Sequence, residues 1–279
     1  YYLIGYFLFR KDDIKQMGFY AFLTIGLIII DCIIGTPLMK SGIMSYDAIN
    51  GVRYYGVGNE YEGVTIASAV FALAVLLNYK KISKWLAVVL SLVILITSAM
   101  PSMGANVGGA ISECVAYLLF ILLIFDIKLD LKKIIMIGVA TVLVVVAFAG
   151  LDFLMGTESH LAVFTNQIIQ EGPAAIFNTF GRKIQMNLKL AKSSVWVNIL
   201  IVSIIIIGAL IFKPSGYFKK IHDKYPMIFK GFMASFVGCI VTLLVNDSGI
   251  VAASTAAIYI LIPIIIIGIN MIIFDKEID

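Results

Sequence analysis

The chain has 279 residues, of which 61% are hydrophobic and only 14% charged, and its formal net charge is +4. This composition, with many apolar runs of about 20 residues, excludes a soluble globular protein and predicts a polytopic membrane protein. The basic residues lie in short clusters between the apolar runs, as membrane topology requires, so we predict no nucleic-acid partner.

The apolar runs predict an all-α transmembrane helical bundle of about eight or nine spans, the first of them truncated. We expect these spans near residues 1–9, 17–37, 63–79, 85–100, 110–125, 134–154, 195–212, 231–245 and 250–274. The sequence predicts one helical domain, 1–279. Because it starts without Met and inside a short apolar run, we expect an excerpt of a longer chain, whose missing parts would be partners.

Polar segments alternate with basic turns along the chain. The turns at 10–16, 80–84, 128–133 and 213–230, together with the tail, hold 15 of the 21 Lys and Arg residues. The positive-inside rule then predicts a cytoplasmic C-terminus and places the segments 38–62, 101–109, 155–194 and 246–250 outside. Apolar positions in 155–194 recur at nearly helical spacing, so part of it is expected to be an amphipathic helix along the membrane surface.

The segment from Gly51 to Gly63 carries the densest chemistry. Arg53 offers a planar charged fork suited to phosphate or carboxylate, and Tyr54 and Tyr55 are suited to stacking on a sugar. An aromatic belt at the membrane interface is the alternative for the tyrosines. Glu60 is a candidate proton donor or acceptor, unless a salt bridge to Arg53 occupies it.

Other candidates are spread over the remaining polar segments. His160 is a candidate general base, and Arg182 is a candidate anion ligand, with a solvated loop and lipid headgroups as the respective alternatives. Asp247 breaks an apolar run, which is typical either of substrate sites in transporters or of a tight turn. With Arg53, Tyr54 and Tyr55, the predicted substrate-binding residues are Asn59, Asn106, Arg182 and Asp247.

Two acids, Asp31 and Glu113, are expected inside spans, where an isolated charge costs several kcal/mol. They indicate either a polar cavity that opens outward or paired groups that fix helix packing. The three cysteines lie in apolar runs without metal-ligand spacing, so we predict no metal, no cofactor and no disulfide.

The order Arg53 to Asn59, a span, a basic turn, another span and a small-residue hairpin resembles the O-antigen ligase and polymerase superfamily. That resemblance implies metal-independent glycan transfer from an undecaprenyl-pyrophosphate carrier. It further implies that Arg53 and Arg182 bind pyrophosphate, and that His160 or Glu60 assists the acceptor hydroxyl. Unlike the family's Asn-Pro-Asn, Asn59 is followed here by Glu and Tyr, and the hairpin lacks arginine.

Four segments also resemble uncharacterised bacterial membrane proteins, a likeness that implies no activity. They are Arg53–Asn59, Gly104–Gly109, Ser159–Leu161 and Asn246–Gly249. The leading hypothesis is therefore a multi-pass protein of the bacterial cytoplasmic membrane whose outward site handles an anionic, polyprenyl-linked envelope glycan, with membrane lipid as partner. The alternatives are an ion- or proton-coupled transporter or flippase, and a non-catalytic membrane module of a larger protein.

Overall fold

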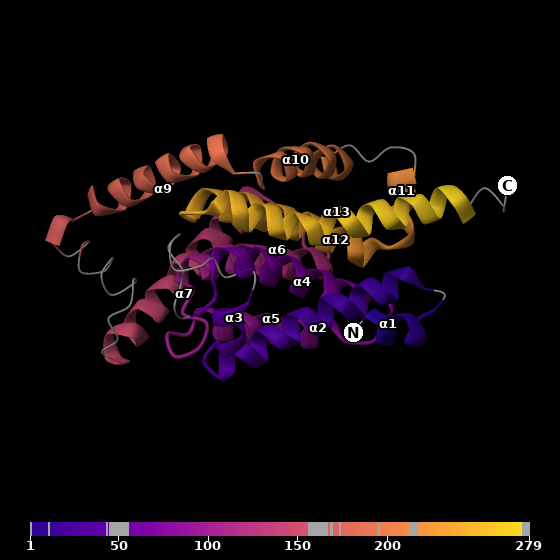
Figure 1. Ribbon diagram of the computed structural model, residues 1–279, viewed down its shortest axis with the longest axis horizontal. Helices are drawn as coiled ribbons and strands as arrows, with labels where there is room; N and C mark the ends of the chain where they lie inside the picture. The colour runs from indigo at the N-terminus through magenta and orange to yellow at the C-terminus, as the bar shows by residue number, and fades with distance from the viewer. Residues whose placement is uncertain are drawn as a thin grey trace.

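The computed structural model describes residues 2–10, 12–42, 44, 56–155, 167, 170–172, 174–194, 196–212 and 217–274. Every regular element within these ranges is an α-helix, and the helices pack side by side as a bundle (Figure 1). The prediction of an all-α bundle is therefore confirmed. Arg53, Tyr54, Tyr55 and His160 lie outside the described residues.

The first half of the chain forms α1 (Tyr2–Leu8), α2 (Asp13–Ile33), α3 (Pro37–Ser41), α4 (Asn59–Asn78), α5 (Lys84–Ala99) and α6 (Val107–Ile124). Side-chain caps fix where several of these helices begin, because they satisfy backbone N–H groups that lack a partner inside the helix. Ser83 accepts from the N–H of Leu86 at 3.1 Å, and Asn106 accepts from the N–H of Gly109 at 2.9 Å.

The second half forms α7 (Leu131–Met155), α9 (Ala174–Ser193), α10 (Trp196–Phe212), α11 (Tyr217–Lys224), α12 (Pro226–Val245) and α13 (Gly249–Phe274). Proline begins α12, where its missing N–H costs nothing. As predicted, the segment 155–194 contains an amphipathic helix, α9, whose exposed Phe177 and Leu188 are interspersed with cationic side chains.

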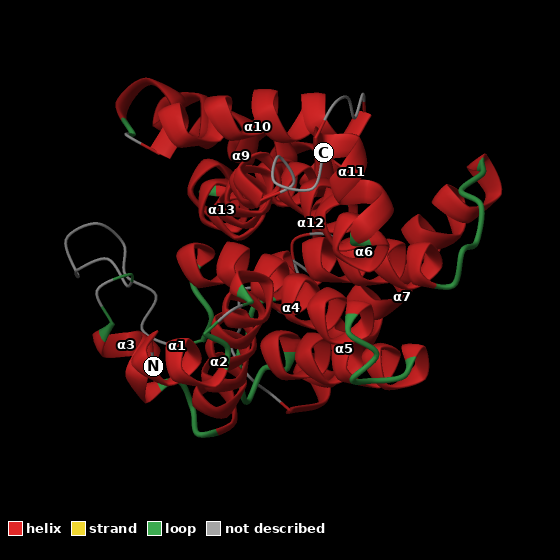
Figure 2. Cartoon of the chain, turned by 90° about the vertical axis from the view of Figure 1, so that its right-hand side faces the viewer, coloured by secondary structure: helices red, strands yellow, loops and turns green. Residues whose placement is uncertain are grey.

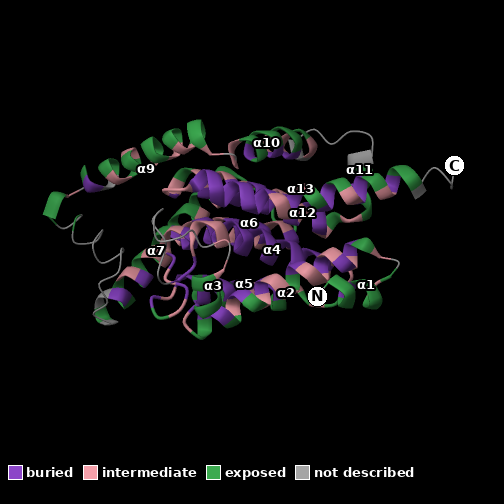
Figure 3. Ribbon diagram, in the orientation of Figure 1, coloured by how far each residue is buried: buried purple, intermediate pink, exposed green. Residues whose placement is uncertain are grey.

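The centre of the bundle is α4, which packs between α12 and α13 on one side and α2 on the other (Figure 2). Small residues let neighbouring helices approach it closely, as is usual between membrane helices. A Cβ atom on Gly63 would lie 1.8 Å from the carbonyl oxygen of Ala252 in α13, and one on Gly231 of α12 would lie 2.8 Å from the Ala74 Cβ. Most of α4 is consequently buried (Figure 3).

The outer helices present large apolar side chains to their surroundings, as lipid-facing helices do. Val142, Leu143 and Val146 of α7, for example, are all exposed. Within the described residues six helices are long and apolar enough to cross a membrane, namely α2, α4, α6, α7, α12 and α13. The bent pair α9 and α10 adds a seventh if it forms one span, and α5 is a shorter apolar helix. Membrane character is thus supported, while eight or nine spans stay a prediction.

One boundary differs from the sequence prediction in a way that matters for the site. The third span was expected to begin at Gly63, whereas α4 begins at Asn59 and includes Glu60 and Glu62 in its first turn. The predicted second span, 17–37, is likewise shifted, because α2 ends at Ile33 and a separate short helix follows. Both acids of α4 are therefore fixed by helical geometry.

Hydrogen bonds tie the polar segments into two groups at opposite ends of α4. At the first end, which we call the Glu62 end, the N–H of Val57 donates to the carbonyl of Gly104 at 2.7 Å. At the second, which we call the Asp126 end, the hydroxyl of Tyr79 donates to the carboxylate of Asp12 at 2.9 Å. The basic turns near residues 15, 84 and 230 all belong to this second end.

Candidate functional site

The Glu62 side chain is completely enclosed, with 0% of its surface exposed, in the first turn of α4. Its carboxylate accepts hydrogen bonds from the hydroxyl of Thr242, from Asn246 Nδ2 at 2.6 Å and from Asn106 Nδ2 at 3.0 Å. We call these four residues the Glu62 cluster. It joins the beginnings of α4 and α6 to the end of α12, three segments that are remote in sequence.

The donors in the cluster are held in fixed orientations. The Oδ1 atom of Asn106 accepts from the N–H of Gly109, so its amide nitrogen must point at Glu62. Asn246 Nδ2 also lies 3.1 Å from the Thr242 hydroxyl. Buried groups with complete hydrogen bonding are rigid, and removing one leaves its partners unsatisfied.

Two glycines at the start of α6 make room for the cluster. A Cβ atom on Gly109 would lie 2.5 Å from Asn106 Nδ2 and 3.1 Å from the carboxyl carbon of Glu62. One on Gly108 would lie 2.9 Å from Asn246 Oδ1. The glycine-rich hairpin of the sequence therefore allows close approach of the α6 backbone to a buried carboxylate.

The amphipathic helix α9 holds the turn that supplies Asn246. Lys183 Nζ donates to the carbonyl of Val245 at 2.6 Å, and Asn187 Nδ2 donates to the carbonyl of Asn246 at 2.7 Å. Asn187 Oδ1 accepts from the N–H of Ile250, so it links both sides of the turn. These bonds satisfy carbonyl groups at the end of α12, where a cation is also favoured by the helix dipole.

Deeper in the bundle, Glu113 of α6 is also fully enclosed. Its Oε2 accepts from the Ser98 hydroxyl at 2.6 Å, while its Oε1 has no hydrogen-bond partner among the residues that the structure describes. Glu113 interacts electrostatically with Glu62 and with Tyr117. Two buried carboxyl groups thus lie on adjacent helices at the same end of the molecule.

Asp31 has a different environment. Its carboxylate accepts from the N–H groups of Leu38 and Met39 at 2.9 and 2.8 Å, so it caps the first turn of α3. Nearby, Thr36 has a left-handed φ of 61°, and its hydroxyl accepts from the N–H of Gly56 at 3.1 Å. Of the two predicted interpretations for Asp31, these contacts favour fixed packing over a polar cavity.

The other predicted site residues are divided between the cluster and its rim. Asn106 is in the cluster, and Asn59 and half-buried Glu60 occupy the first turn of α4 beside it. Arg182 and Asp247 form an ion pair at 3.3 Å on the surface above. The predicted residues Arg53, Tyr54, Tyr55 and His160 lie outside the described part of the chain.

Sequence reasoning missed the buried centre of the site. It did not select Glu62, Thr242, Asn246 or Asn187 as site residues. The sequence does contain a pattern for Glu62. A helix that begins at Asn59 places this acid on the same face as Gly63 and Ile66, which are buried. No sequence pattern indicates that Asn187 of α9 reaches the α12–α13 turn.

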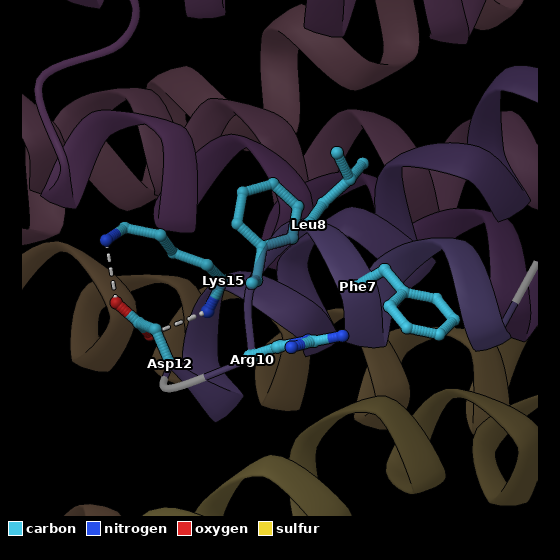
Figure 4. A pocket seen from close by; sticks show the side chains of 6 residues that line it. Phe7, Leu8, Arg10, Asp12 and Lys15 are labelled. Atoms are coloured by element: carbon cyan, nitrogen blue, oxygen red, sulfur yellow. Dashed lines mark hydrogen bonds and ion pairs between the residues drawn. The ribbon is translucent and has the colours of Figure 1, made fainter.

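The described residues contain no group of three or more His, Cys, Asp or Glu that could hold a metal ion. All three cysteines of the chain are free and buried. An open hollow of about 370 Å³ lies at the other end of the molecule, lined by residues 7–10, Asp12 and Lys15 (Figure 4). Its polar groups are already occupied, since Lys15 pairs with Asp12 at 2.8 Å and Arg10 lies over Phe7.

Comparison with models of known protein families, with characterised proteins and with solved structures finds no match for this chain. The resemblance to O-antigen ligases and polymerases therefore stays a prediction. The geometry of the chain itself supports a membrane protein with a closed, carboxylate-centred cluster at one end.

Proposed function

We propose that the protein is a proton-coupled carrier of the bacterial cytoplasmic membrane, and that the Glu62 cluster is the gate at its outer end. The observation that supports this proposal is the burial of the α4 carboxylate among three donors, one from the start of α6 and two from the end of α12. Such a carboxylate is suited to coupling proton binding to helix movement, because adding one proton changes all three of its hydrogen bonds together. The outer location of this end follows from the predicted topology.

In the ionised form, the Glu62 carboxylate binds all three donors and holds α4, α6 and α12 together. When the carboxyl group takes up a proton from the outer solution, one oxygen becomes an O–H donor. It then faces two amide N–H groups that can only donate, while the Thr242 hydroxyl must turn from donor to acceptor. The attraction between Glu62 and these donors then weakens, since a neutral acceptor binds N–H groups less strongly than a carboxylate does. The start of α6 and the α12–α13 turn are released from α4.

The groups around Glu62 determine when this happens. Lys183 and the carboxyl groups of Glu60 and Glu113 all interact with it electrostatically.

Glycan transfer receives less support from the geometry. The pyrophosphate ligands implied by the resemblance are Arg53, which lies outside the described residues, and Arg182, whose guanidinium is paired with Asp247. Glu60 retains a position at the rim of the cluster, so its proposed role in transfer stays a separate prediction.

Charge movement in proteoliposomes tests the carrier proposal without knowledge of the cargo. On a solid-supported membrane, a step from neutral to mildly acidic pH should produce a transient displacement of charge in the wild type. Glu62→Gln should lose the part of this signal that comes from Glu62, because an amide cannot bind a proton in this range. Asp130→Asn is a matched control: it also removes one acid, but from the exposed cap of α7, where asparagine caps equally well.

A wild-type response no larger than that of empty liposomes would contradict the proposal, as would a full response from Glu62→Gln. Thermal unfolding and gel filtration of each variant establish that the folded protein is being compared.

A further inference from the structure

A second feature of the bundle is a group of enclosed polar atoms one helical turn and more below the Glu62 cluster. Among the described residues, Glu113 Oε1, the Tyr117 hydroxyl and the Ser112 hydroxyl are buried without hydrogen-bond partners. Each side chain is at most 3% exposed. Such unsatisfied groups are rare in folded proteins and require a physical reason.

Two of these groups, Glu113 and Tyr117, lie on one face of α6 and form, with Asn106 at its N-cap, a path into the bundle. Asn106, Glu113 and Tyr117 are separated by seven and then four residues, so they recur on one face of the helix at increasing depth. Gly109 lies between the first two, and its backbone passes beside the carboxyl carbon of Glu62. The distance from Asn106 to Glu113 along the helix is about 10 Å.

We propose that Glu113, with Ser98 and Tyr117, forms a second proton-binding site that exchanges protons with the outer solution when the Glu62 gate opens. The proposal rests on the proposed function for the identity of the gate. The proton comes from water entering past Glu62, an O–H bond forms at Glu113 Oε1, and the same bond breaks when the proton leaves.

The choice of a proton over a metal cation follows from the number of oxygen ligands. A buried carboxylate with a single donor is costly unless it binds a proton or a cation. A sodium or calcium ion requires several oxygen ligands converging on it, whereas a proton needs only the free Oε1 and one acceptor. Ser98 already occupies Oε2, which leaves Glu113 suited to a proton.

Several titratable groups from neighbouring helices face this site. Glu62 of α4, Cys32 of α2, and Cys114 and Tyr117 of α6 all interact electrostatically with Glu113. Helix α7, which packs on α6, carries the buried Asp152. Glu62 is the neighbour that should matter most, because a proton on either carboxyl group removes a like charge from the other.

Infrared difference spectra of the full chain in lipid, recorded between neutral and acidic pH in H₂O and in D₂O, test the inference. The wild type should show a protonated carboxyl band that shifts in D₂O and disappears in Glu113→Gln. In Ser98→Ala the band should remain but move to higher frequency, because the carboxyl group loses a hydrogen bond. If Glu113→Gln does not fold, the shift of the carboxyl band in Ser98→Ala tests the inference instead.

A pH-dependent carboxyl band that is unchanged in both variants would overturn the second site, as would a response of Glu113 to sodium at constant pH. The two proposals fail separately. If the carboxyl band of Glu113 appears but the charge displacement that depends on Glu62 does not, only the gate proposal is contradicted. If the charge displacement appears but the Glu113 band does not, only the second proton-binding site is contradicted.

Discussion

At one end of α4 a buried carboxylate binds uncharged donors, whereas at the other end exposed carboxylates bind lysines. Glu62 has 0% exposure and three side-chain donors, while the Asp126 side chain is 67% exposed and pairs with Lys84 and Lys230. Exposed ion pairs contribute little to stability because water screens them. Enclosed carboxylates are expensive and demand complete hydrogen bonding, so the Glu62 end is where we expect chemistry.

The largest expected effect is on stability at the Glu62 end. Glu62→Ala leaves the Thr242 hydroxyl and two amide N–H groups buried without an acceptor, each costing about 1 to 3 kcal/mol. The thermal unfolding midpoint in detergent should fall sharply. Glu60→Ala, in the same helical turn but half-buried, should change it much less. An equal fall of the unfolding midpoint in Glu62→Ala and Glu60→Ala would show that the hydrogen bonds of Glu62 do not stabilise the bundle.

A backbone change next to the cluster should have the next largest effect. In Gly63→Val the new side chain meets the Ala252 carbonyl and the Thr255 hydroxyl, so α4 and α13 must separate, at a cost of about 2 to 3 kcal/mol. Gly26→Val on α2 is the matched control, because no atom lies within 4 Å of a Cβ there. Thermal stability and the expression of folded monomer are measured for both variants. Similar values for Gly63→Val and Gly26→Val would argue against the close α4–α13 contact.

A smaller effect is expected from α9. Asn187→Ala removes the bonds to the carbonyls of Leu243 and Asn246 and to the N–H of Ile250, which should cost about 1 to 2 kcal/mol. Hydrogen exchange should accelerate at residues 243–250 and remain unchanged at residues 126–131. Unchanged exchange around the turn would mean that α9 does not hold it.

The smallest effect is expected from mild acid at the Asp126 end. The hydrogen bond and charge of Lys230, with Lys84 nearby, lower the pKa of Asp126. Partial burial raises the pKa of Asp12, but hydrogen bonds from Lys15 and Tyr79 lower it overall. These contributions to stability are complete above the ordinary carboxyl pKa of about 4 and are lost only as pH falls through the lower folded values. Chemical shifts of the two Asp residues should therefore stay constant between neutral pH and pH about 5. If the chemical shift of Asp12 or Asp126 changed between neutral pH and pH about 5, the contrast between the Glu62 end and the Asp126 end would be contradicted.

Much of the helical architecture could be predicted, because lipid-facing helices require long apolar runs. The alternation of basic turns also placed Lys15, Lys84 and Lys230 at a common end, as the structure has them. The site was harder to predict, because Glu62 becomes a buried group only once α4 begins at Asn59. Asn246 was part of a recognised segment, yet its partner lies 184 residues away in sequence. Contacts of that kind arise from helix packing, and one sequence contains no direct record of it.

Access to Cys114 is the most direct test of a proton-operated gate at Glu62. Cys114 is 2% exposed and follows Glu113 on α6, while Cys239, at 3%, packs in the core on α12 and serves as an internal reference. We predict that the rate at which a small maleimide labels Cys114, divided by the rate for the same thiol in the unfolded chain at that pH, is low at neutral pH, higher at mildly acidic pH, and high at both in Glu62→Gln. The same ratio for Cys239 should stay unchanged throughout, because the division removes the loss of thiolate in acid. Peptide mass spectrometry separates the two sites. Cys114 labelling that is indifferent to both pH and Glu62→Gln would contradict a gate at this end.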